Sequence, residues 1–322
     1  MGKPSIPDHA DGETMKAVCF TSFGKTTDAL SVETIPKPSV DSPDEVLIKV
    51  HACALNPIDK LRMSGDLSLI NPEAYDTSVL GYDVAGEVVQ VGEEVSKEYS
   101  VGDEVYVRLA GMKYGALRTG GVKEGSKVFI PGGAGGVGSI AIQIAKKMLK
   151  ASHVTTTASP GAGTDICSKV GADRIIDYRS EDVVKVLAGE DFDMAFDTMN
   201  QAAEFGGLIK NGGKIVSISG TPTIEAIESA SKFGSPSLLV RAFMFMSRNR
   251  AAENNAKKAG ATWEYIFMKP NGNDLAEIAK YVESGDIVPI IDTEASSLDE
   301  FAVAADKLFS GRAKGKCVIK VA

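Results

Sequence analysis

Five glycines gather in GGAGGVG, residues 132–138, between an apolar run and an amphipathic run. Gly133, Gly135 and Gly138 have the G-x-G-x-x-G spacing, which binds dinucleotides where a strand turns into a helix. The first glycine permits a tight turn, the second lets the backbone approach a pyrophosphate, and the third lets helix and strand pack closely. The anion would lie on free N–H groups at the positive end of the helix. A flexible turn without a ligand is the alternative. The predicted phosphate-binding residues are Gly133, Ala134, Gly135, Gly136, Val137 and Gly138.

The residues after the next predicted strand indicate which nicotinamide nucleotide is bound. An NAD site usually has Asp or Glu there, on the ribose 2′-OH. The strand over 153–159 instead ends with Thr157 and Ser159, whose hydroxyls can donate to a 2′-phosphate. Tyr178 and Arg179, after the third strand, supply a further donor and a cation, or form an ordinary surface turn. The pattern favours NADPH.

Strands and helices alternate on both sides of the glycine turn. The predicted strands are apolar runs, and most predicted helices have apolar residues at helical spacing or end at a glycine. The strands cover 126–132, 153–159, 173–178, 192–199 and 213–220. The helices cover 137–150, 163–171, 180–189 and 201–212. This alternation of strands and helices predicts an α/β domain with a doubly wound parallel sheet, the Rossmann arrangement.

The part of the chain before the glycine turn has a different residue pattern. Val-rich runs with partial alternation predict an antiparallel β domain, with strands over 15–20, 45–55, 84–92 and 103–109. Near the C-terminus we expect helices over 273–285 and 297–311 and strands over 287–292 and 316–322. The last strand can return to pair with the N-terminal β domain.

Four segments follow from these patterns. We expect a disordered leader over 1–14, a β domain over 15–120, a nucleotide-binding domain over 121–268, and a return to the β domain over 269–322.

Composition excludes several classes of protein. The chain has 322 residues, a formal net charge of −8 and no basic stripe, which argues against nucleic acid or an anionic membrane as the main partner. The apolar stretch 238–246 is too short to span a bilayer and contains Arg241. Four cysteines lie far apart without a C-x-x-C pair, which predicts buried, reduced thiols. With no signal peptide visible, we expect a soluble cytoplasmic protein.

Eight motifs, in this order, resemble the medium-chain dehydrogenase/reductase superfamily, and most closely its zinc-free quinone and enone reductase branch. They are ALNPID (54–59), GYDVAGEVVQVG (81–92), VGDEVY (101–106), GGAGGVG (132–138), GADRIIDY (171–178), GGKIVSI (212–218), YIFMKPNGNDL (265–275) and GRAKGKCVIKV (311–321). The resemblance runs from about Met15 to the end. It implies a GroES-like β domain built from both chain ends, a Rossmann domain between them, and NADPH as the cofactor.

The resemblance also implies a homodimer formed edge to edge through the Rossmann sheets. Residues 235–246 are our candidate for that edge, and a core strand followed by a helix is the alternative. Ser219, at the end of the fifth predicted strand, and the backbone of Phe267 are further expected cofactor contacts.

The family's zinc positions predict a metal-free site. Zinc-dependent members have Cys where Asn56 stands and a His-Glu pair where Tyr82 and Asp83 stand, and Asn and Tyr are poor zinc ligands beside thiolate and imidazole. Hydrogen-bond donors in a dry cleft would then stabilise negative charge on a carbonyl oxygen. The matching or nearly matching positions, each with a structural role as its alternative, are Asn56, Asp59, Lys60 and Tyr82.

These residues predict an NADPH-dependent, zinc-independent reductase that transfers a hydride to a small-molecule quinone or α,β-unsaturated carbonyl; the same residues disfavour a zinc alcohol dehydrogenase. Two departures from the family pattern favour an alternative, an NADPH-binding protein with weak or no catalysis. The link over 107–126 is shorter than in relatives and lacks part of one cleft wall. The stretch Asp197-Thr198-Met199-Asn200 lacks a glycine that relatives usually have there.

Overall fold

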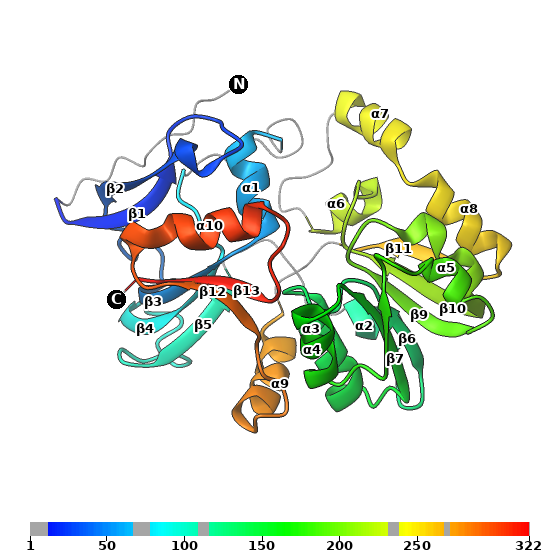
Figure 1. Ribbon diagram of the computed structural model, residues 1–322. Helices are drawn as coiled ribbons and strands as arrows, with labels where there is room; N and C mark the ends of the chain where they lie inside the picture. The colour runs from blue at the N-terminus through cyan, green and yellow to red at the C-terminus, as the bar shows by residue number, and fades with distance from the viewer. Residues whose placement is uncertain (1–11, 67–77, 109–115, 231–237, 267–270, 322) are drawn as a thin grey trace. The chain divides into compact units, whose positions relative to one another are not determined.

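The computed structural model describes residues 12–66, 78–108, 116–230, 238–266 and 271–321. The chain divides into two compact units, one of residues 1–110 with 291–322 and one of residues 111–290 (Figure 1). Residues 269–290, which we expected in the return to the β domain, belong to the second unit. No helix in the described ranges is long and apolar enough to cross a membrane.

The second unit is built on a six-stranded parallel sheet. Its spatial order is β11 (Thr262–Tyr265), β10 (Ile209–Ser217), β9 (Phe192–Asp197), β6 (Lys127–Ile130), β7 (His153–Ala158) and β8 (Arg174–Asp177). The chain starts in the middle at β6, moves outward through β7 and β8, and returns to the other side at β9. This order confirms the predicted Rossmann arrangement and creates a topological switch point between β6 and β9.

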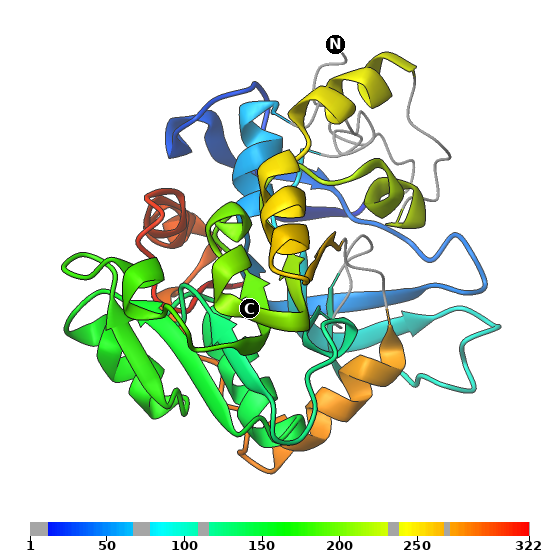
Figure 2. The ribbon, with the colours of Figure 1, turned by 90° about the vertical axis from the view of Figure 1, so that its right-hand side faces the viewer.

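Helices pack on both faces of this sheet (Figure 1). On one face α2 (Ala116–Thr119) and α3 (Gly138–Gln143) share a buried cluster with the strands, and on the other face α5 (Val183–Val186) and α8 (Arg250–Lys258) do so. The unit also contains α4 (Ala162–Lys169), α6 (Ile224–Ala230), α7 (Leu238–Ser247) and α9 (Gly272–Glu283). The first turns of α3 continue as a π-helical turn over Ile144–Met148. Helix α8 packs on β10 and β11 (Figure 2).

Each face buries its own core, because neighbouring side chains of a strand point to opposite faces. Val128 and Ile130 of β6 join the cluster that includes α3. Phe129 joins the other cluster, with its ring centroid 5.6 Å from that of Phe192 and 5.1 Å from that of Phe205.

The helix predicted over 201–212 is wrong. Two short 3₁₀ turns end at Leu208, and β10 begins at Ile209. A Cβ on Gly206 would lie 2.6 Å from the main chain of Asn255, so glycine is what lets α8 approach here. Gly206 and Gly207, in the middle of this segment, also disfavour a helix.

Residues 235–246, our candidate for the dimer edge, form helix α7 from Leu238 onward, and residues 235–237 lie outside the described residues. The outer strands of the described sheet are β11 and β8. The homodimer and its edge stay predictions.

The first unit contains a five-stranded sheet drawn from both halves of the chain. Its order is β12 (Ile291–Ala295), β13 (Lys316–Lys320), β3 (Val46–Leu55), β4 (Asp83–Val91) and β5 (Glu104–Arg108). β13 runs antiparallel to β3, with Cys317 opposite Leu55. A separate antiparallel pair consists of β1 (Thr14–Phe20) and β2 (Leu30–Pro36). The sheet confirms the GroES-like domain built from both chain ends.

Two helices of this unit share its core. They are α1 (Pro57–Ser64) and α10 (Phe301–Phe309), and α10 packs on β12 and β13 (Figure 1). Phe20, Met63 and Ile319 belong to one buried cluster, so segments from both ends of the sequence are held by the same apolar contacts.

Candidate functional site

The glycine-rich turn follows β6 at the carboxyl edge of the parallel sheet, beside the switch point. The main-chain N–H groups of Ala134, Gly136 and Val137 have no acceptor in the described part of the chain. They precede the first residue of α3, where the helix dipole is positive. The turn therefore presents unpaired donors that suit an anion.

Packing requires glycine at two positions of the turn. A Cβ on Gly133 would lie 2.1 Å from Oγ1 of Thr156, and one on Gly138 would lie 2.3 Å from the carbonyl oxygen of Gly132. A Cβ on Gly135 would meet only that carbonyl oxygen, at 3.3 Å. The protein's own packing therefore excludes side chains at 133 and 138 but nearly admits one at 135.

Two threonines of β7 hold this turn. The N–H of Gly132 donates to Oγ1 of Thr157 at 3.0 Å, and the N–H of Gly133 donates to the carbonyl oxygen of Thr157 at 3.1 Å. The hydroxyl of Thr156 donates to the carbonyl of Ile130 at 2.6 Å. Thr157 is 6% exposed, so its hydroxyl lies beneath the turn, where it fixes the shape of the loop.

The other predicted cofactor residues line the same edge of the sheet. Ser159, Tyr178 and Ser219 follow β7, β8 and β10, and Tyr178 is 52% exposed. Ser159 and Ser219 are half-buried, and their hydroxyls have no hydrogen-bond partner within the described ranges. Phe267 lies outside the described residues.

The end of β9 is organised around Asp197. Its buried carboxylate accepts bonds from the Ser217 hydroxyl and from main-chain N–H groups of Met199, Gln201 and Ala202. Asn200 has φ of 59°, in the left-handed region that favours glycine but that Asn tolerates. The turn that lacks a glycine is therefore formed with Asn in the left-handed position.

In the first unit, Asn56 and Asp59 form the start of α1. The N–H of Asn56 donates to Oδ2 of Asp59 at 2.8 Å, and the N–H of Gly81 donates to Oδ1 at 2.9 Å. Burial raises the pKa of Asp59 above its usual range, although these two N–H groups oppose that shift. Asp59 thus joins α1 to the segment at Gly81.

The side chain of Asn56 takes part in a polar triad with Asp83 and Lys316. Nζ of Lys316 donates to Oδ1 of Asn56 at 2.8 Å and to Oδ2 of Asp83 at 2.9 Å. Nδ2 of Asn56 donates to the same Asp83 oxygen at 2.8 Å and to the carbonyl of Ala54 at 3.4 Å. The Asn56 amide is held in one orientation as a result.

Sequence reasoning missed Lys316. The available signal was its place at the start of the last strand, in GKCVIKV, together with the expected return of that strand to the β domain. Its partners depend on the register between two strands far apart in sequence.

Lys60 and Tyr82 make separate contacts. Nζ of Lys60 donates to the carbonyl of Phe309 at 2.7 Å, which ties α1 to α10. The guanidinium carbon of Arg62 lies 5.3 Å from the ring centroid of Tyr82, a cation–π contact. The structure therefore brings the predicted catalytic residues Asn56 and Asp59 together, whereas Lys60 and Tyr82 have other neighbours.

No group of three or more His, Cys, Asp or Glu side chains in the described ranges could hold a metal ion. Burial, followed by the carboxylates of Asp59 and Asp83, raises the pKa of the Cys53 thiol to about 11. This thiol therefore stays protonated at neutral pH.

Comparisons with known proteins match both units. Residues 42–153 match the alcohol dehydrogenase GroES-like domain, and residues 170–319 match the zinc-binding dehydrogenase family. The chain is 30% identical over 350 residues to 2-methylene-furan-3-one reductase of Solanum lycopersicum, covering 95% of this chain and 79% of that protein. It is 29% identical, with the same coverage, to the chloroplastic NADPH-dependent alkenal/one oxidoreductase of Arabidopsis thaliana.

Both alignments run over more positions than the 322 residues of this chain, so these relatives contain residues that the chain lacks. Among solved structures, the quinone oxidoreductase of Coxiella burnetii superposes with a TM-score of 0.76 at 26% identity, covering 96% of this chain and all of that one (100%). The Escherichia coli quinone oxidoreductase, solved with NADPH, has the same fold, with a TM-score of 0.71 at 19% identity over 95% of this chain and 100% of that one.

Proposed function

The chain belongs to the medium-chain dehydrogenase/reductase superfamily, in its quinone oxidoreductase and alkenal/one reductase branch, and we propose that it reduces quinones or α,β-unsaturated carbonyls with NADPH and without zinc. One observation carries this proposal. At the carboxyl edge of the second unit, unpaired N–H groups of the glycine turn lie beside a strand end that has a hydroxyl and no carboxylate.

The residues of this edge fit NADPH. Ala134, Gly136 and Val137 would bind the diphosphate through main-chain N–H groups, and the missing side chain at Gly135 would let the diphosphate approach. Ser159 and Tyr178 would bind the 2′-phosphate, with Ser219 further along the edge. When bound, the reduced nicotinamide supplies the hydride.

The first unit would bind the electrophile through neutral or paired polar groups. Asn56 stands where zinc-dependent relatives have a cysteine, and its amide oxygen is bonded to the Lys316 ammonium. An amide in this state is a poor metal ligand beside thiolate and imidazole. The names of the two plant relatives, a furanone reductase and an alkenal/one oxidoreductase, support an enone or a related electrophile as the substrate.

Stopped-flow absorbance at the NADPH band tests the proposal. We expect turnover with at least one member of a panel of quinones and enones, and at least 10-fold lower kcat/KM with NADH. Metal chelation should leave the rate unchanged. A folded protein that binds NADPH and reduces none of the panel contradicts the proposed activity.

The second candidate is an NADPH-binding protein with weak catalysis. It is favoured by the residues that the plant relatives have and this chain lacks, which we expect to fall in the shortened link over 107–126. Calorimetry separates the two functions, because this candidate gives normal NADPH binding heat without reduction of any electrophile.

A further inference from the structure

We propose that Lys316 is the hydrogen-bond donor that stabilises negative charge on the oxygen of the substrate. This inference rests on the proposed reductase function and assigns a role to a residue in the first unit.

The fold places Lys316 at the end of β3. β13 pairs with β3 so that Cys317 lies opposite Leu55, which puts Lys316 beside Asn56, the residue that follows β3. The 2.8 Å and 2.9 Å bonds to Asn56 and Asp83 fix the ammonium from two sides. A cation held by two partners loses less conformational freedom when it meets a third.

The donors of this triad can be counted. Asn56 has two amide N–H bonds, and they are directed at Asp83 and Ala54, so this residue has none left for a substrate. An ammonium has three N–H bonds, and Lys316 uses two within the described part of the chain. Its side chain is 27% exposed, and in this proposal the third N–H meets the ligand.

Charge favours a neutral acceptor over a phosphate. The carboxylate of Asp83, 26% exposed, already balances the positive charge of Lys316. A phosphate dianion at the third N–H would be repelled by this carboxylate. A carbonyl oxygen is neutral when it binds and becomes negative only as the reaction proceeds. The hydrogen bond that Lys316 donates to this oxygen therefore strengthens in the transition state.

The chemistry is a two-electron reduction. Hydride adds to the β-carbon of an enone, forming a C–H bond and moving the π electrons to oxygen as an enolate. With a quinone, the same addition forms the hydroquinone monoanion after rearrangement. One proton from water then completes the product. Lys316 donates a hydrogen bond to the anionic oxygen and is not consumed.

The test replaces Lys316 by Met, with Lys320→Met as the matched control. Lys320 lies four residues further on the same strand, is 55% exposed and pairs with Glu294. We expect K316M to lower kcat about 100-fold, as removal of one oxyanion donor does, with NADPH affinity within twofold of wild type. K320M should leave both unchanged.

A third variant, Lys316→Gln, covers the case in which K316M does not fold. Gln retains N–H donors without the charge, so its kcat should lie between those of wild type and K316M. A loss of NADPH affinity that accounts for the whole rate loss overturns the proposal, and so does an unchanged kcat in folded K316M or K316Q. If wild type itself reduces no electrophile, the proposed function fails instead.

Discussion

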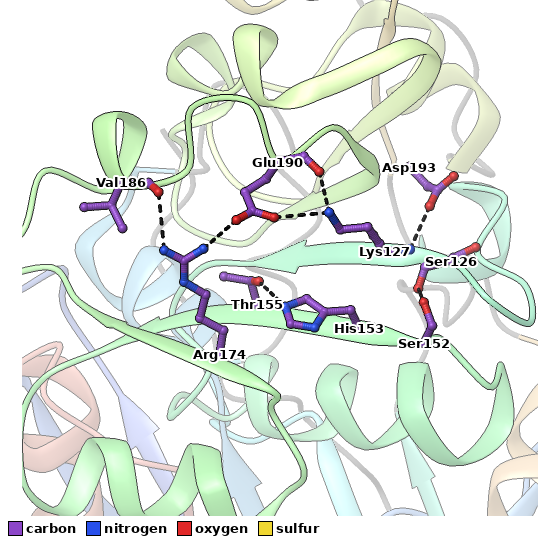
Figure 3. Close-up of polar contacts among 9 residues, drawn as sticks. All are labelled: Ser126, Lys127, Ser152, His153, Thr155, Arg174, Val186, Glu190 and Asp193. Atoms are coloured by element: carbon purple, nitrogen blue, oxygen red, sulfur yellow. Dashed lines mark hydrogen bonds and ion pairs between the residues drawn. The ribbon is translucent and has the colours of Figure 1, made fainter.

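The two edges of the parallel sheet in the second unit differ in whether their polar groups are paired. At the amino edge, Glu190 accepts bonds from Lys127 at 3.1 Å and from Arg174 at 2.6 Å (Figure 3). At the carboxyl edge, the glycine turn presents N–H groups with no acceptor in the described ranges. Charges that satisfy one another stabilise a fold, whereas unpaired donors remain available to a ligand.

Further hydrogen bonds pair the polar groups of the amino edge with one another. The N–H of Lys127 donates to Asp193 at 2.7 Å, and His153 lies 3.1 Å from the hydroxyl of Thr155 (Figure 3). The paired charges of the amino edge therefore indicate stability, and the unpaired N–H groups of the glycine turn indicate binding. Substitutions at the two edges test this contrast.

Gly133→Val should have the largest effect, because its Cβ meets Thr156 Oγ1 at 2.1 Å and also approaches Ile142 and Cys167. We expect a loss of about 3 kcal/mol or more in unfolding free energy, as overpacking causes, and loss of NADPH binding. Urea denaturation followed by the fluorescence of Trp263, the single tryptophan, measures the unfolding free energy. The control is Gly207→Ala, whose Cβ meets nothing within 4 Å. Equal stability of G133V and wild type would contradict the packing argument.

Ser159→Asp should reverse the preference between cofactors. A carboxylate at the end of β7 repels a 2′-phosphate and accepts a bond from a ribose 2′-OH. We expect NADPH affinity to fall about 50-fold and NADH affinity to be kept or improved, as measured by calorimetry. Ser168→Asp adds the same charge at an exposed position of α4 and should change neither affinity. A parallel loss for both cofactors would argue against Ser159 as a phosphate contact.

Gly135→Ala separates binding from packing. Its Cβ would meet only the Gly132 carbonyl, at 3.3 Å, so we expect a melting temperature within about 2 °C of wild type. The added methyl would lie where the diphosphate approaches, and NADPH affinity should fall about 10-fold. Unaltered affinity would show that the phosphates lie elsewhere.

Glu190→Gln should have the smallest effect and should depend on pH. The hydrogen bond from Lys127 is the main cause that lowers the pKa of Glu190. A lowered pKa in the folded state gives stability that is present above the unfolded value, about 4.5, and is lost as pH falls through the folded value. The side chain is 30% exposed, so we expect a cost of only about 1 kcal/mol at pH 7 that shrinks as pH falls below 4.5, with NADPH affinity unchanged.

The control for this variant is Glu264→Gln, whose 3.4 Å pair with Lys214 is more exposed. It should cost less than about 0.5 kcal/mol. If E190Q weakened NADPH binding, the division between a stabilising edge and a binding edge would be wrong.

Local patterns in the sequence predict the architecture of both units. The alternation of apolar runs with helical periodicity after residue 121 predicts the parallel sheet, because these patterns are local and repeat over many residues. The spacing of Gly133, Gly135 and Gly138 predicts the turn, because the conformation of a glycine-rich loop depends mainly on its own residues. The helix predicted over 201–212 is wrong for a local reason, since Gly206 and Gly207 interrupt the segment and β10 begins at Ile209.

Which side chains meet depends on the folded structure. Lys316 and Asn56 are 260 residues apart, and their contact depends on the register of β13 against β3. The hydroxyl of Thr157 looks available in sequence, yet it lies under the turn and bonds to Gly132. Such contacts depend on how distant segments pack, and one residue of register would move each side chain to the opposite face.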